Sequence, residues 1–164
     1  MGKELVIERV FDAPVERVWK AWTEPEQVMK WWGPKGFSAP VIEIDFRIGG
    51  KYLYCMRASD EMAKMLGRKD FWNTGTYKEI VPHKKLVATD SFADEKGNVV
   101  PAAYYGMSKN FALESTVTII FEEQHDGRTK TLIRYSGVPE GETMEQASQG
   151  WEQSLDKLAD SLAT

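Results

Sequence analysis

The sequence predicts an α+β fold in which a curved antiparallel sheet of about six or seven strands packs against a long C-terminal helix. Two patterns support this prediction. Between residues 41 and 136, apolar residues repeat with a period of two in short segments, which is typical of strands joined by tight turns. Between Glu142 and Leu162 they repeat with the period of a helix, and this helix needs a large apolar surface to cover its stripe.

The N-terminal part is expected to form one strand and two short helices. Within Lys3 to Phe11, the residues Leu5, Ile7 and Phe11 fall on one face of a strand. The next apolar residues follow at helical spacing and form one stripe: Val15, Val18, Trp19 and Trp22. A second short helix is expected before the Trp-Trp-Gly-Pro sequence at residues 31–34, where the two tryptophans are interpreted as a wedge between the helices and the sheet or as a pocket rim.

The remaining strands follow from the two-residue period and from their β-branched and aromatic content. Their predicted ranges are 41–46, 51–57, 74–81, 86–92, 113–123 and 129–136. Two long segments, 58–70 and 93–110, interrupt this order. Met62, Met65 and Leu66 predict a short helix in the first segment, and both segments are expected to be mobile and to lie at one mouth of a cavity.

Length and composition limit the class of protein. A chain of 164 residues is expected to form a single domain over residues 1–164. A formal net charge of −4 argues against binding of nucleic acid, and no apolar run reaches the length of a membrane span. The N-terminus lacks the features of a signal peptide, so the expected location is the cytoplasm.

The usual catalytic and metal-binding motifs are absent from the sequence. His83 and His125 lie in polar turns without a second ligand nearby, and Cys55 has no neighbour that would lower its pKa. There is no nucleophile elbow, phosphate-binding loop or dinucleotide fingerprint. We therefore expect no metal and no cofactor. Asp90 and Arg134 are charged residues within strands, and either one would be the natural anchor for a charged ligand group if it pointed inward.

The aromatic content is the most informative feature. Six Trp, six Tyr and seven Phe favour an aromatic-lined cavity between the C-terminal helix and the sheet, although ordinary core packing remains the alternative. We expect Tyr52, Tyr54 and Trp151 on the wall of a cavity of at least the ~300 Å³ typical of ligand pockets. The residues assigned to this candidate ligand site are Tyr52, Tyr54, Met56, Tyr77, Phe92, Tyr105, Met107, Tyr135, Met144 and Trp151.

Four segments carry a resemblance to a known family: residues 11–23, 31–34, 49–52 and 150–158. In the order of its elements the chain resembles the helix-grip fold of START-related and birch-pollen-allergen-like proteins. Its motifs resemble the family named for activators of the heat-shock chaperone's ATPase, and the match covers nearly the whole chain. The resemblance implies a helix-grip domain, on which lipid carriers, hormone receptors, polyketide cyclases and hydrolases all occur.

The leading functional hypothesis is the binding of a small apolar, aromatic or lipid-like molecule between the sheet and the C-terminal helix. Two alternatives stay open. One is an enzyme of cyclase or hydrolase type on the same cavity, for which no acid/base pair is evident. The other is a co-chaperone-like interaction, as the family name implies. The expected partner is therefore a small apolar molecule, with a chaperone or a second copy of the chain as further candidates.

Overall fold

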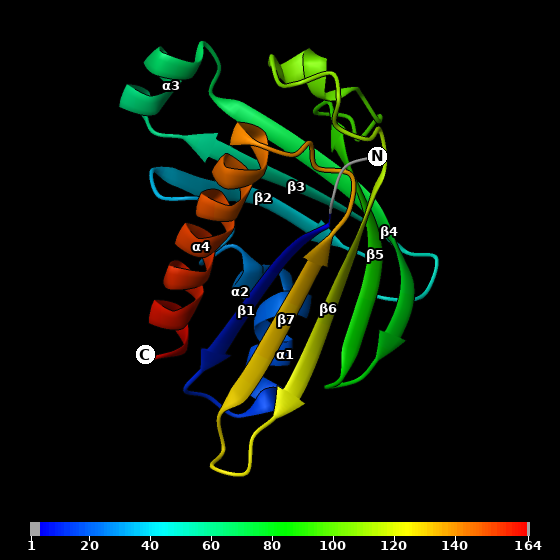
Figure 1. Cartoon of the computed structure of the whole chain (residues 1–164), viewed down its shortest axis with the longest axis vertical. Coiled ribbons are helices and arrows are strands. Elements are labelled where there is room, and N and C mark those ends of the chain that lie inside the picture. Colours follow the sequence, from blue (N-terminus) through cyan, green and yellow to red (C-terminus); the bar gives the residue numbers. More distant parts are fainter. Residues whose placement is uncertain (1–3, 164) are drawn as a thin grey trace.

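The structure is a computed structural model that describes residues 4–163 (Figure 1). Its strands are β1 Leu5–Phe11, β2 Phe37–Ile44, β3 Lys51–Ala58, β4 Asp70–Val81, β5 Lys85–Ala93, β6 Ser115–Glu123 and β7 Thr129–Tyr135. Its helices are α1 Val15–Thr23, α2 Pro25–Val28, α3 Asp60–Leu66 and α4 Glu142–Leu162, with a 3₁₀ turn, η1, at Ala102–Tyr105. The order of elements confirms the predicted α+β fold. Individual strands start or stop a few residues from the predicted ends; β2, for example, begins four residues earlier.

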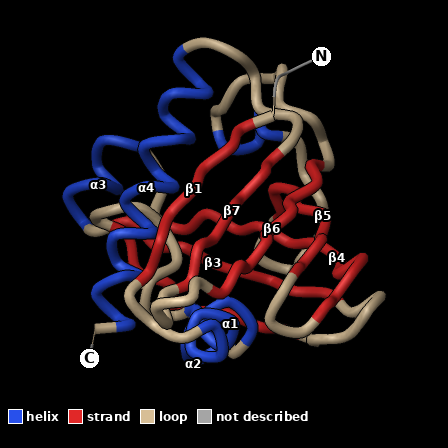
Figure 2. The backbone as a smooth tube through the Cα atoms, turned by 60° about the horizontal axis from the view of Figure 1, so that its bottom comes forward, coloured by secondary structure: helices blue, strands red, loops and turns tan. Residues whose placement is uncertain are grey.

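The seven strands form one antiparallel sheet in the order β1-β7-β6-β5-β4-β3-β2. Strands β2 to β7 follow one another as a meander that starts at one edge of the sheet. The N-terminal strand β1 pairs with β7 and forms the other edge. The sheet curves around α4, and α1 and α2 close one end of its concave side (Figures 1 and 2). This is the helix-grip arrangement.

Helix α1 and the second half of α4 provide most of the tight core. Val18 on α1 is completely buried, as are Leu155 and Leu158 on α4. They pack against Phe11 of β1 and Ile133 of β7 in one continuous cluster. The predicted stripes of both helices therefore face the concave side of the sheet.

The two halves of α4 are held differently. All four buried residues of the helix lie in its second half: Ser154, Leu155, Leu158 and Leu162. Polar contacts add to this anchorage, since Lys157 Nζ donates to the Phe37 carbonyl at 3.0 Å and Arg9 pairs with Asp156 at 3.0 Å. The first half, residues 142–151, has no buried residue and begins without a side-chain cap. It is the less firmly attached half of the helix.

The segment 58–70 contains the short helix that was predicted. The Ser59 hydroxyl accepts a hydrogen bond from the Met62 amide, which caps the N-terminus of α3, and Gly67 ends the helix in a left-handed conformation. No residue of α3 is buried, and Met65 is 78% exposed. In Figure 1, α3 follows the end of β3 at the top of the view.

The segment 93–110 folds back onto the ends of β4 and β5. The Tyr105 hydroxyl donates to the Ala93 carbonyl and accepts a hydrogen bond from the Trp72 amide. The Arg68 guanidinium lies 4.7 Å from the centre of the Tyr105 ring, so it connects this segment to the one that contains α3. Both segments lie at the end of the sheet where α4 begins (Figure 1), and their mobility stays a prediction.

Within residues 4–163, no helix is long and apolar enough to cross a membrane. In the same part of the chain, no cluster of three or more His, Cys, Asp or Glu side chains could hold a metal ion.

Candidate functional site

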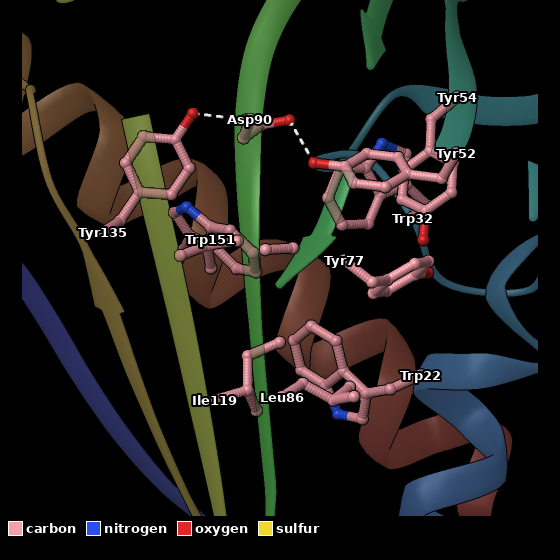
Figure 3. A pocket seen from close by; sticks show the side chains of 12 residues that line it. Trp22, Trp32, Tyr52, Tyr54, Tyr77, Leu86, Asp90, Ile119, Tyr135 and Trp151 are labelled. Carbon is pink, nitrogen blue, oxygen red and sulfur yellow. Dashed lines mark hydrogen bonds between the residues drawn. The ribbon is translucent and has the colours of Figure 1, made fainter. Parts of the chain in front are cut away.

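A small cavity lies between the concave face of the sheet and the helices (Figure 3). Seven aromatic side chains line it: Trp22, Trp32, Tyr52, Tyr54, Tyr77, Tyr135 and Trp151. Aliphatic side chains of β5 and β6 complete the apolar wall: Leu86, Ala88, Val117 and Ile119. Asp90 is the one charged residue in this wall, among the residues that the structure describes.

The volume of the cavity is about 50 Å³, which is much less than the sequence led us to expect. The rings fill most of the space between α4 and the sheet. Those of Tyr52 and Tyr54 lie 4.6 Å apart and those of Trp32 and Tyr54 4.8 Å apart, measured between their centres. A water molecule needs about 10–15 Å³ of such volume, so the cavity has room for roughly four non-hydrogen atoms. The predicted volume of at least ~300 Å³ is wrong for this arrangement of the side chains.

Five of the ten predicted site residues line the cavity: Tyr52, Tyr54, Tyr77, Tyr135 and Trp151. The other five do not: Met56, Phe92, Tyr105, Met107 and Met144. Met144 packs against the core, Met56 lies beside Gly33, and Met107 is half-buried in the loop after η1.

Phe92 and Tyr105 belong to a second group of rings at the end of the sheet where α4 begins. The centres of the Phe92 and Tyr105 rings are 5.9 Å apart, and Phe71 and Phe111 contact them at 5.4 and 5.6 Å. These contacts hold the segment 93–110 against β4 and β5. Phe92 on β5 and Tyr105 in η1 therefore pack against each other outside the cavity.

Tyr52 crosses the neighbouring strand to reach the centre of the sheet. Its hydroxyl contacts the Thr89 carbonyl at 2.7 Å and Asp90 Oδ1 at 2.7 Å, both on β5. Gly75 of β4 makes this possible. A Cβ atom at that position would lie 2.6 Å from the Tyr52 ring and 1.9 Å from the Thr89 oxygen.

Asp90 is the centre of a hydrogen-bond network at one end of the cavity (Figure 3). Tyr135 donates to Oδ2, and the Asn73 amide nitrogen donates to Oδ1 at 2.8 Å. With Tyr52 this gives the carboxyl group three side-chain donors from three different strands. The residue keeps some accessible surface and lines the cavity, although its carboxyl group is largely buried.

Burial controls the ionisation of this group. It raises the pKa of Asp90 above the ordinary value, and the hydrogen bonds from Tyr135, Asn73 and Tyr52 act in the opposite direction. Burial also raises the pKa of Tyr52 and of Tyr135 well above the usual value, and the neighbouring Asp90 adds to both shifts. These two tyrosines therefore act as hydrogen-bond donors over the whole physiological range.

The network can accommodate Asp90 in either charge state. The Tyr52 hydroxyl has one proton and two oxygen neighbours at 2.7 Å. When the carboxyl group is protonated, it can donate to Tyr52 while Tyr52 donates to Thr89. When it is ionised, Tyr52 can turn its proton toward Asp90. Rotation of one hydroxyl is thus enough to satisfy both forms.

The tryptophans form the opposite wall. Trp151 of α4 stacks on Trp22 of α1 with 6.2 Å between ring centres, and Trp32 stands nearly perpendicular to Trp151 at 5.8 Å. The buried Trp22 Nε1 has no hydrogen-bond partner among residues 4–163. Trp31 is completely buried and donates to the Ala21 carbonyl at 2.9 Å. Trp31 is thus the predicted wedge, whereas Trp32 lines the cavity.

Asp90 lines the cavity although it is not among the ten predicted site residues; the sequence identifies it only as an anchor for a charged ligand group if it points inward. The signal was present in the sequence, because Leu86, Ala88 and Asp90 alternate on one face of β5 and the first two are buried. Arg134, the other candidate, is half exposed and pairs with Glu4 at 3.7 Å. Cys55 is completely buried on the opposite side of β3, and burial raises its pKa to about 11.

Comparison with known proteins identifies one matching family. The sequence model of the family described as Activator of Hsp90 ATPase homolog 1-like protein matches residues 12–163. A search of curated proteins finds no match.

Solved bacterial structures resemble the chain over almost its whole length. A crystal structure of a protein from Chromobacterium violaceum is 27% identical, with a TM-score of 0.75 and coverage of 99% of both chains. A solution structure from Arthrobacter aurescens is 25% identical, with a TM-score of 0.74 and coverage of 98% of this chain and 86% of that one. The AHSA1 protein from Silicibacter pomeroyi is 21% identical and shares the fold, with a TM-score of 0.74 and coverage of 98% of both chains.

Proposed function

We propose that this chain, which belongs to the family of Activator of Hsp90 ATPase homolog 1-like proteins, binds a small and mostly apolar molecule in the cavity between α4 and the sheet. The observation that carries the proposal is the composition of the wall. Ligand sites are mostly apolar with a few fixed polar groups. Here the rings and aliphatic side chains surround one carboxyl group, which Tyr52, Tyr135 and Asn73 hold in place.

The size of the cavity limits the ligand in the closed arrangement. With about 50 Å³ it accepts a molecule of roughly three to five non-hydrogen atoms. An aromatic or lipid-like ligand requires that the first half of α4 move outward. Trp151, which is half-buried, ends that half and contributes to the wall. Motion of residues 142–151 would enlarge the cavity without disturbing the buried leucines of the second half.

A reaction of cyclase or hydrolase type on the same cavity is the second candidate. Asp90 favours this candidate, because it is a carboxyl group in a mostly apolar site. Burial raises the pKa of Asp90, and a raised pKa is typical of catalytic acids and bases. Activation of a chaperone ATPase, which the family description names, is the third candidate. None of the residues described for the cavity bears on that activity.

Titration with tert-butanol tests the binding proposal, with nuclear magnetic resonance signals of the indole N–H groups as the readout. Trp22, Trp32 and Trp151 line the cavity, whereas Trp19 and Trp72 do not. We expect the signals of the three lining tryptophans to shift together along one saturable curve, while those of Trp19 and Trp72 stay in place; Trp31, the sixth tryptophan, packs against Trp22 and Trp32 and is not used as a control. Shifts of all tryptophans in proportion to the alcohol concentration, or no shift at all, would overturn the proposal.

A further inference from the structure

The preference of the cavity among small molecules can be inferred from its wall, and this inference rests on the proposed function. The wall has one acidic residue and no basic residue among the residues that the structure describes. Asp90 is there, but no lysine, arginine or histidine is among the described residues that line the cavity. The carboxyl group has only uncharged donors: Tyr52, Tyr135 and Asn73. An ionised Asp90 therefore has no cationic partner within the site.

We propose that the cavity selects a small organic cation, an ammonium group that carries methyl substituents, over a neutral molecule of the same size.

The aromatic rings support this selection. The face of an aromatic ring attracts cations, and tryptophan does so most strongly. Three tryptophans and four tyrosines surround the cavity. Methyl groups on the nitrogen would contact these rings, while the charge would lie near the carboxylate in a region of low dielectric constant. A neutral ligand gains the same apolar contacts but not the electrostatic attraction.

The volume is consistent with the same class. Tetramethylammonium has five non-hydrogen atoms, which is close to the number that about 50 Å³ can hold. Larger cations would have to displace Trp151. We therefore expect the smallest methylated ammonium ions to bind without rearrangement of α4.

The hydrogen-bond network allows the carboxyl group to change its charge when the cation enters. A protonated Asp90 releases its proton to solvent, and the Tyr52 hydroxyl turns from the Thr89 carbonyl to the new carboxylate. Tyr135 and Asn73 already donate to the same group. The other titratable groups facing the cavity are Tyr54 and Tyr77, which share a hydrogen bond, and burial raises the pKa of both. They stay neutral, so Asp90 is the group whose ionisation changes with binding.

The test compares tetramethylammonium chloride with tert-butanol at constant ionic strength, because the two probes have equal numbers of non-hydrogen atoms and differ in charge. The indole N–H signals of Trp22, Trp32 and Trp151 give both dissociation constants. We expect the cation to bind at least tenfold more tightly. Equal or weaker binding of the cation, with saturable binding of the alcohol, would overturn the cation inference and leave the proposed function intact. If neither probe shows saturation, both fail.

A variant and a pH series make the assignment to Asp90 specific. Asp90→Asn keeps the shape of the side chain without its charge, and we expect its affinity for tetramethylammonium to fall at least tenfold more than its affinity for tert-butanol. The wild-type chain should bind the cation more tightly as the pH rises from 4 to 9, because the carboxyl group ionises, whereas binding of the alcohol should not change. A variant that binds the cation as tightly as the wild-type chain, or a pH-independent affinity for the cation, would contradict the inference.

Discussion

The hydroxyl of Tyr52 on β3 lies 2.7 Å from the carboxyl oxygen of Asp90 on β5, and the contact spans the strand between them. It depends on Gly75 of β4, where a side chain would occupy the path of the ring. Tyr135 approaches the same carboxyl group from β7. The polar end of the cavity is therefore assembled from strands that only the complete sheet brings together.

Gly75→Ala should disrupt this contact. The new Cβ atom would lie 1.9 Å from the Thr89 carbonyl oxygen and 2.6 Å from the Tyr52 ring, and the oxygen belongs to the backbone and cannot rotate away. We expect a loss of about 1–3 kcal/mol in the free energy of unfolding, measured by urea denaturation. Gly150→Ala is the control, since its Cβ would meet only Pro34 at 3.9 Å. Within the helix this substitution should stabilise by about 0.5–1 kcal/mol. Equal effects of the two variants would show that Gly75 is not required for close packing.

Asp90 should make the stability of the protein depend on pH. Because burial raises its pKa in the folded state, the folded protein holds this proton more tightly than the unfolded chain. The corresponding stabilisation is complete below the unfolded pKa of about 3.9 and is lost as the pH rises through the folded pKa. Asp90→Asn cannot ionise, so its free energy of unfolding relative to the wild-type chain should increase from pH 4 to pH 8. Urea denaturation at several pH values measures this difference. If the free energies of unfolding of the two proteins changed with pH in the same way, the raised pKa of Asp90 would be contradicted.

Trp151→Ala and Leu158→Ala should separate binding from folding. Leu158 is completely buried, and its truncation is expected to cost about 2–5 kcal/mol of unfolding free energy while leaving affinity for tert-butanol nearly unchanged. Trp151 is half-buried beside the cavity, so its truncation should cost about 3 kcal/mol or less and weaken binding more than folding. Urea denaturation and titration of both variants decide the matter. If Trp151→Ala unfolds the domain and the folded fraction binds as the wild-type chain does, Trp151 is a core residue.

Hydrogen exchange should distinguish the two halves of α4. Residues 142–150 have no buried side chain, whereas residues 153–162 include all four buried residues of the helix. We expect the first half to exchange faster, together with 58–70 and 93–110, and the second half to exchange as slowly as β6. Uniform protection along α4 in the absence of ligand would argue against opening at this end.

The sequence predicted the fold well because its signals are local. The stripe that contains Leu155 and Leu158 and the alternation of Tyr52 and Tyr54 each depend on a single period, and both face the concave side as predicted. The order of elements that these periods predict is also what carries the resemblance to the helix-grip fold.

The residues that line the cavity could be predicted only in part, and its volume could not be predicted. Asp90 shares its phase with Leu86 and Ala88, but a charged residue in a strand faces water in most proteins, so the sequence alone did not place it inside. Phe92 has the same phase as Asp90, yet it contacts Tyr105 from a loop whose path no period describes. The volume depends on how closely the rings pack, which follows from side-chain rotamers and not from spacing.

The most direct test of the binding site is a measurement of nuclear Overhauser effects between bound tert-butanol and the protein. We expect contacts from the methyl protons of the alcohol to the rings of Trp151 and Tyr135 and to the methyl groups of Ile119, all of which line the cavity. We expect none to Met65, which is exposed on α3. Contacts confined to exposed residues such as Met65, with none to Trp151 or Tyr135, would contradict a ligand site between α4 and the sheet.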